Sequence, residues 1–173
     1  MRFFLPLFCL LILSSCGNTF YITRHAEKEQ VTPGMTAMEK TDPPLATSGL
    51  QRAIDLKEVL RNKHIRYIFS TNYKRTISTA QPLKEILSTT YIEIYSPVKD
   101  STDVFISKLK SIKKGNVLIV GHSNTIDDIA NKLCGSNVVP GDLKENQYDN
   151  LFKIKRKGKK YIFTGKKYGA LSE

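Results

Sequence analysis

Short apolar runs rich in β-branched residues alternate along the chain with longer segments in which apolar residues recur every three or four positions. The short runs predict β-strands, and the longer amphipathic segments predict helices. The predicted strands span residues 19–23, 67–69, 91–95, 116–120, 148–155 and 160–164. The predicted helices span residues 50–60, a segment from after Thr71 to about Leu87, residues 104–113 and residues 125–133.

This alternation predicts a mostly parallel central sheet with helices on both faces, which is a three-layer α/β/α sandwich. Thr47 or Ser48 is expected to cap the first long helix, and the turn residues within 30–44 predict a surface loop. A chain of 173 residues suits one domain with a substantial core, which we expect at residues 19–173.

The first sixteen residues differ in kind from the rest. An apolar run from residue 3 to residue 13 follows Met1 and Arg2, and it is too short to span a bilayer as a helix. Such a run predicts a secretory signal. It closes with Leu13-Ser14-Ser15-Cys16-Gly17, which resembles the bacterial lipoprotein processing box, so we predict residues 1–16 as a signal peptide with lipidation at Cys16. An uncleaved anchor and a simple signal peptide are the alternatives.

Lipidation of Cys16 would hold the domain at a membrane of the cell envelope, on the periplasmic or the surface side. Cysteine usage agrees with export without disulfides, because Cys9 lies in the apolar run and Cys134 alone would remain in the mature domain. Cys134 is expected to be a small buried residue near a helix end and not a catalytic group.

The formal net charge of +11 favours anionic partners. Much of the excess lies within residues 153–160 and at Lys166-Lys167, where it could attract phosphate-bearing substrates, acidic lipid headgroups or nucleic acid. A solvated hairpin with outward lysines is the simpler interpretation. Because no zinc-finger spacing or aromatic RNA-binding motif accompanies these charges, we do not expect nucleic acid as a partner.

Polar residues stand at the ends of several predicted strands. Arg24-His25, Ser70, residues 97–100 and Gly121-His122 each follow a strand, and open α/β sheets bind ligands beyond the carboxyl ends of their strands. We therefore expect these segments to converge on one pocket. Arginine matches phosphate geometry with paired hydrogen bonds, and a neutral imidazole can attack phosphorus and carry the phosphoryl group. The pattern predicts a site for phosphoryl transfer.

Four motifs extend this interpretation. Thr23-Arg24-His25-Ala26-Glu27 and Val120-Gly121-His122-Ser123 resemble the Arg-His signature and the second histidine motif of the histidine phosphatase superfamily, which has the phosphoglycerate mutase-like fold. Residues 45–53 resemble its Leu-Thr-x-x-Gly-x-x-Gln-Ala segment, and residues 70–80 resemble the segment with its second phosphate-binding arginine, here Arg75. The motifs occur in the order of the family, over about residues 20–133.

The resemblance implies that His25 is the nucleophile and becomes phosphohistidine, while Arg24, Arg75 and His122 bind the transferring phosphoryl oxygens. Ser123, at the amino end of the following helix, is expected to help bind the phosphate. The chain lacks the long insertions of mutases and phytases, so hydrolysis is expected instead of mutase chemistry. Since the sequence contains no two-histidine helix face or clustered carboxylate motif, we expect neither a metal nor another cofactor.

The proton donor for the leaving oxygen has no clear match. Many family members supply a glutamate after the third strand, and this chain has Asp100 and Asp103 there. We predict Asp100, because it leaves the strand before the helix starts, whereas Asp103 suits a helix cap. Glu27 is the other candidate, with pairing to Lys28 as its alternative role. A weak acid would favour good leaving groups, such as aryl phosphates or phosphohistidine.

The sequence thus predicts an enzyme that hydrolyses a small phosphorylated substrate, a phosphomonoester, in the cell envelope. A phosphohistidine-protein phosphatase and a lipoprotein that binds phosphorylated ligands without turnover are the alternatives. Because binding alone would not require a nucleophile, the presence of both His25 and His122 favours catalysis. The oligomeric state is left open.

Overall fold

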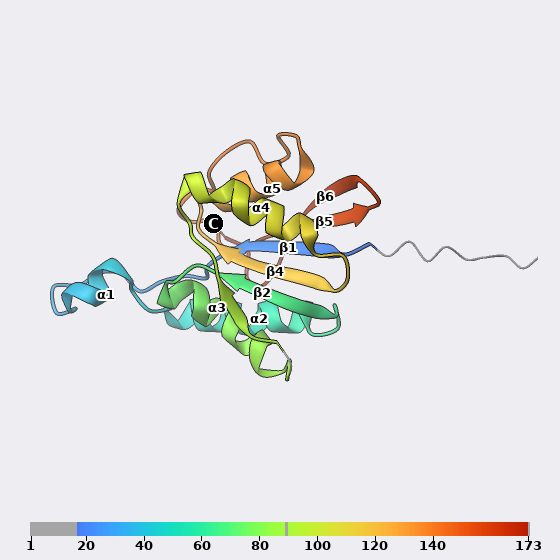
Figure 1. Cartoon of the computed structure of the whole chain (residues 1–173). Helices are drawn as coiled ribbons and strands as arrows, with labels where there is room; N and C mark the ends of the chain where they lie inside the picture. Colours follow the sequence, from blue (N-terminus) through green and yellow to red (C-terminus); the bar gives the residue numbers. More distant parts are fainter. Residues whose placement is uncertain (1–16, 89, 173) are drawn as a thin grey trace, which may run out of the picture.

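A six-stranded sheet forms the centre of the molecule in a computed structural model, which describes residues 17–88 and 90–172 (Figure 1). The strands are β1 (Thr19–Arg24), β2 (Ile65–Ser70), β3 (Ile92–Ile94), β4 (Asn116–Gly121), β5 (Asn150–Lys157) and β6 (Lys160–Lys167). Their order across the sheet is β3-β2-β4-β1-β5-β6. The first four are mutually parallel, and β5 and β6 are antiparallel to their neighbours.

Helices cover both faces of this sheet (Figure 1). They are α1 (Ala37–Thr41), α2 (Thr47–Leu60), α3 (Lys74–Glu85), α4 (Thr102–Ser111) and α5 (Ile126–Cys134), with a 3-10 turn η1 (Lys99–Ser101) before α4. The helices α2 and α3 pack on one face, and α4 and α5 pack on the other (Figure 1). The predicted three-layer sandwich with a mostly parallel sheet is therefore confirmed.

The strand β4 shows why this sequence forms a sheet with helices packed on both faces. Its side chains alternate between the two layers, so that Val117 and Ile119 pack with α4 and α5, while Leu118 and Val120 pack with α2 and α3. All four are fully buried. A strand with both faces buried is apolar at successive positions, which is the continuous run seen in the sequence.

The helix α2 differs from its prediction in its cap and in its buried face. Its N-cap is Ala46 and makes no side-chain cap hydrogen bond, so the predicted cap at Thr47 or Ser48 is wrong. The backbone N–H of Ala46 donates to the carbonyl of Glu27 at 3.0 Å, which fixes where the helix begins. Gly49 then lies so close to Glu27 that a Cβ would stand 2.1 Å from its carbonyl oxygen.

This close approach sets the rotation of α2. The buried side follows Gly49 at helical spacing and comprises Gly49, Arg52, Ala53, Leu56 and Leu60. Three other apolar residues of the helix, Leu50, Ile54 and Val59, are exposed although they recur at helical spacing with the buried ones. Arg52 enters the interior because Glu27 is there to pair with it.

The predicted surface loop at residues 30–44 contains the short helix α1, which projects away from the sheet at the end where the parallel strands finish (Figure 1). A capping box starts it, because Thr36 accepts from the Glu39 N–H and the Glu39 carboxylate accepts from Thr36. None of the residues of α1 is buried. The sequence contains this Thr-x-x-Glu signal, although the turn residues around it favoured a loop.

The predicted signal peptide and Cys16 lie outside the described residues. Among residues 17–88 and 90–172, no helix is both long enough and apolar enough to cross a membrane. Cys134 lies at the end of α5 with its side chain partly buried, and burial raises the pKa of its thiol.

Candidate active site

The carboxyl ends of β1, β2 and β4 open onto a cleft of about 560 Å³. Predicted site residues from three separate segments line this cleft, namely Arg24, His25, Arg75, His122 and Ser123. The remaining lining residues are Lys28, Tyr73, Pro97, Asn124, Thr125 and Glu145. Parallel strands that end together bring these residues to one place, although as many as 121 positions separate Arg24 from Glu145 in the chain.

His25 follows β1 directly, and its backbone N–H donates to the carbonyl of Gly121 at 2.9 Å. Its Nδ1 atom lies 2.7 Å from the carbonyl oxygen of Ala26. Since a carbonyl only accepts, Nδ1 holds the proton and Nε2 has a free lone pair. The residue is 4% exposed. Burial, together with the positive charges of Arg24 and Arg75, lowers the pKa of His25 to about 3, so the ring is neutral at physiological pH.

Arg24 is 2% exposed and is held by the segment before β5. Its Nη1 donates to the carbonyls of Lys144 and Glu145 at 3.0 and 2.8 Å, and its Nη2 donates to Glu145 Oε2 at 3.0 Å. The guanidinium lies over the ring of Tyr148, 4.1 Å from its centroid. Its Nε atom is buried and has no hydrogen-bond partner within the described part of the chain.

Arg75 lies in the first turn of α3. Its Nη1 donates to Asp42 Oδ1 at 2.9 Å, and the other oxygen of Asp42 accepts from the Lys74 backbone N–H at 2.6 Å. The carboxylate of Asp42 thus satisfies the amino end of α3 and orients the guanidinium at the same time. The Nε atom of Arg75, like that of Arg24, is buried and finds no partner among residues 17–88 and 90–172.

His122 lies beside His25, with 5.5 Å between the ring centroids. Its Nδ1 faces Arg75 Nη2 at 3.5 Å, and its Nε2 lies 2.9 Å from Thr71 Oγ1. An arginine only donates, so Nδ1 accepts and the Nε2–H donates to Thr71. The hydroxyl of Thr71 can then donate to Thr76 Oγ1 at 2.9 Å. Burial, with the charges of Arg75 and Arg24, lowers the pKa of His122 to about 4.

The three candidates for the proton donor do not line the cleft. Asp100 lies in η1 and is exposed, because β3 ends at Ile94 and it is Pro97 that reaches the cleft. Asp103 is on α4 and pairs with Lys132 at 2.5 Å. Glu27 pairs with Arg52, at 2.7 Å, and not with Lys28. The prediction that Asp100 points into the pocket is therefore wrong in this structure.

The carboxylate that lines the cleft is that of Glu145. Its side chain is 74% exposed, pairs with Arg24 at 3.0 Å and approaches Lys28 Nζ at 4.0 Å. Sequence reasoning missed Glu145, since it lies in a polar segment between α5 and β5 without a motif of its own. It also missed Asp42, which it treated only as a turn residue. Long-range contacts bring Glu145 into the cleft and Asp42 against the cleft residue Arg75.

Positive charge in the cleft comes from Arg24, Arg75 and Lys28. The residues that the structure describes contain no group of three or more His, Cys, Asp or Glu side chains placed to hold a metal ion. The geometry offers a neutral imidazole with a free lone pair, beside the buried guanidinium of Arg24 and the partly buried guanidinium of Arg75, each with an unused Nε–H. Such an arrangement can bind a tetrahedral oxyanion and attack its central atom.

Comparison with known proteins agrees with this chemistry. Residues 20–96 match the sequence model of the histidine phosphatase superfamily (branch 1). No curated protein sequence matches the chain. The resemblance to this superfamily that the sequence motifs predicted is confirmed by the model match and by the fold.

Three solved structures illustrate the similarity in fold. The α-ribazole phosphatase of Shigella flexneri is 14% identical, with a TM-score of 0.64 over 90% of this chain and 96% of that one. Phosphoglycerate mutase of Bacillus anthracis is 16% identical, with a TM-score of 0.61 over 88% and 93%. The protein histidine phosphatase SixA, complexed with tungstate, is 13% identical, with a TM-score of 0.60 over 86% and 96%.

Proposed function

Taking the chain as a protein of the histidine phosphatase superfamily, we propose that it hydrolyses phosphate monoesters through a phosphohistidine formed on His25. One observation supports this most strongly. The free Nε2 of His25 and the unpartnered Nε–H groups of Arg24 and Arg75 belong to residues that line one cleft. Buried donors without acceptors are costly, and a bound phosphoryl group would satisfy both.

In the first step, the Nε2 lone pair of His25 attacks phosphorus and the bond from phosphorus to the ester oxygen breaks. The ring acquires positive charge as the N–P bond forms, and the Ala26 carbonyl that accepts from Nδ1–H stabilises that charge. Arg24 and Arg75 neutralise the negative charge of the phosphoryl oxygens. The leaving oxygen departs as an anion or takes a proton from solvent or from an acid in the cleft.

In the second step, water attacks phosphorus, the N–P bond breaks, and inorganic phosphate leaves. The electron pair of the N–P bond returns to Nε2, so His25 is regenerated in its original tautomer. The proton lost by the attacking water passes to solvent or to the phosphate itself. His122 lies beside His25, with 5.5 Å between the ring centroids, and its Nδ1 accepts from Arg75, so it helps to orient a guanidinium that binds the phosphoryl oxygens in both steps.

A phosphohistidine-protein phosphatase is the second candidate. One feature favours it: the cleft carboxylate of Glu145 is paired with Arg24, and so is poorly placed to protonate an alkoxide. Phosphohistidine and aryl phosphates have leaving groups that need little protonation. The fold shared with the protein histidine phosphatase SixA, whose structure holds the oxyanion tungstate, agrees with this substrate class.

Hydrolysis of p-nitrophenyl phosphate by the purified chain tests the proposal, with His25→Ala as the inactive variant. His64→Ala is the matched control, because His64 is exposed and outside the cleft. Rapid quenching during turnover is expected to trap a phosphorylated enzyme that survives alkali and is lost in acid, in the unmodified protein and in His64→Ala only. Equal rates for His25→Ala and the unmodified chain would contradict catalysis by His25, and no hydrolysis above the buffer rate by either protein would favour a protein that binds phosphorylated ligands without turnover.

From residues 1–16 alone, we further propose that the protein is lipidated on Cys16 and anchored in the cell envelope. Mass spectrometry of the amino-terminal peptide from native cells tests this. A diacylated or triacylated Cys16 at the terminus is expected. An intact peptide beginning at Met1 would contradict it.

A further inference from the structure

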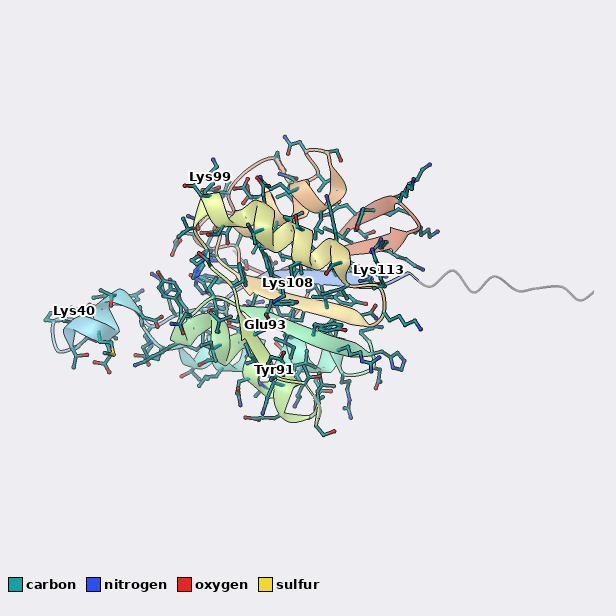
Figure 2. The ribbon with its side chains drawn as sticks, viewed as in Figure 1. Lys40, Tyr91, Glu93, Lys99, Lys108 and Lys113 are labelled. Carbon is teal, nitrogen blue, oxygen red and sulfur yellow. The ribbon has the colours of Figure 1, made fainter. Side chains whose placement is uncertain are left out.

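The end of the sheet opposite the cleft is strongly basic. Three loops meet there: the connections into β2 and β4 and the turn between β5 and β6. These loops and the adjoining ends of β2 and β5 contain six exposed cationic side chains that we call the basic edge: Lys63, Arg66, Lys113, Lys114, Lys157 and Lys159. In Figure 2, Lys113 lies at this end, whereas Lys40 and Lys99 lie at the other.

Two asparagines tie the three loops together. Asn116 accepts from the Thr19 N–H at 2.8 Å, and its side-chain amide donates to the carbonyl of Lys63. Asn18 donates to the carbonyl of Ile112 at 3.1 Å, and its own carbonyl accepts from the Arg156 N–H at 2.9 Å. The backbone that bears the basic edge is therefore a fixed feature of the fold.

These charges are not neutralised within the protein. In the described part of the chain, none of the six side chains of the basic edge forms an ion pair with a carboxylate. The nearby Arg61 shows the contrast, since it pairs with Glu58 at 2.9 Å. Six unpaired cations spread over three loops suit an extended anionic surface better than a single small anion.

The position of the first described residues indicates that this anionic surface is a membrane. Asn18, the residue before β1, is bonded to Arg156 next to the β5–β6 turn. The apolar run at residues 3–13 lies five residues before Asn18, and five extended residues reach at most about 17 Å. If Cys16 is the anchor, two residues reach about 7 Å, which is within a Debye length at physiological salt. Any membrane that holds this run or Cys16 therefore lies against the basic edge.

We propose that the basic edge docks onto an anionic lipid surface and turns the cleft away from the bilayer. The strands β1 and β4 each run six residues from the basic edge to the cleft, a distance of about 20 Å. Docking therefore leaves the cleft open to substrates in solution. The inference does not depend on the phosphatase activity, because it rests on charges at the far end of the sheet.

Vesicle flotation of the full chain tests the docking. The probes are vesicles of phosphatidylcholine alone and vesicles with about 30 mol % phosphatidylglycerol, and the readout is the ratio of the two partition coefficients, since the apolar run contributes to both. Each basic residue near an anionic surface favours binding by about fivefold. The unmodified chain is expected to prefer anionic vesicles by at least about tenfold, and K113E/K159E is expected to lose most of that preference.

The matched control is K40E/K99E, which changes the net charge equally at exposed positions away from the basic edge (Figure 2). It is expected to keep the preference, and both variants are expected to hydrolyse p-nitrophenyl phosphate at the unmodified rate if they fold. An equal loss in both variants would reduce the effect to net charge and overturn the proposal. A ratio of the two partition coefficients near one for the unmodified chain would also overturn it. Displacement of the vesicles by duplex DNA at equal phosphate concentration would do the same.

Discussion

The Oε2 atom of Glu145 lies 3.0 Å from Nη2 of Arg24, so a carboxylate occupies one side of a guanidinium that we propose binds phosphate. The contact crosses from the segment before β5 to the end of β1. Because the Glu145 side chain is 74% exposed, it can move away when an anion enters. Arg24 would then exchange one carboxylate oxygen for a phosphoryl oxygen.

Replacing this carboxylate tests whether Glu145 only competes with phosphate for Arg24 or donates a proton to the leaving group. We expect Glu145→Gln to lower KM for p-nitrophenyl phosphate by about fivefold, because one negative charge that repels the dianion is removed, and to leave kcat unchanged. Steady-state kinetics with p-nitrophenyl phosphate and glycerol phosphate measure this, with Glu58→Gln on the exposed side of α2 as the control. A fall in kcat that is larger for glycerol phosphate would instead make Glu145 the proton donor.

The hydroxyl of Thr71 is predicted to fix the tautomer of His122. Thr71→Val removes the acceptor of the Nε2–H while keeping the shape of the side chain, so we expect kcat to fall by about tenfold. Nitrogen NMR shifts of the His122 ring should change from one tautomer to a mixture. Thr71→Ser, which restores the hydroxyl, should recover both the rate and the single tautomer. Loss of rate with an unchanged NMR signature would contradict a role through the ring proton.

Acid is predicted to destabilise the protein through the two cleft histidines. Their folded pKa values, about 3 for His25 and about 4 for His122, lie below the ordinary value of 6.5. The unfolded chain therefore takes up protons that the folded chain does not, and the stabilisation present above pH 6.5 is lost as the pH falls toward the folded values. Each histidine changes the free energy of unfolding by about 1.4 kcal/mol per pH unit in that window.

Urea unfolding across that pH window measures the effect. His25→Gln should reduce the slope of the free energy of unfolding against pH by about 1.4 kcal/mol per unit, because one of the two groups no longer titrates. Replacement of the exposed His64 should leave the slope as it is. The same slope in His25→Gln and in the unmodified chain would show that His25 is not held neutral.

The ion pair of Glu27 and Arg52 is predicted to stabilise the fold next to the site. Arg52 is 4% exposed and donates to both carboxylate oxygens of Glu27. Glu27→Ala leaves a buried positive charge without its partner, which should lower the free energy of unfolding by roughly 3 kcal/mol. Thermal and urea unfolding measure this change. Glu58→Ala, on the exposed side of the helix that carries Arg52, should change the free energy of unfolding little. If Glu27→Ala kept its stability and lost only activity, Glu27 would be a chemical group of the site.

The sequence alone was enough to find the sheet and the histidines. Buried strands such as β4 have apolar residues at successive positions, and this local signal needs no knowledge of the partner strands. Arg24 ends one such strand, His25 directly follows it, and His122 follows another. Because parallel strands end at a common edge, the sequence already implied that these residues lie close together.

Tertiary structure alone decided the rotation of α2, the carboxylates that contact the cleft arginines, and the place where unpaired cationic side chains cluster. The rotation of α2 follows from the close approach of Gly49 to Glu27, and hydrophobic periodicity did not detect it. Asp42 and Glu145 reach Arg75 and Arg24 across 33 and 121 positions, while Asp100 turns away in η1. Such contacts depend on loop paths, which are set by many weak interactions between distant residues and leave no periodic pattern in the chain.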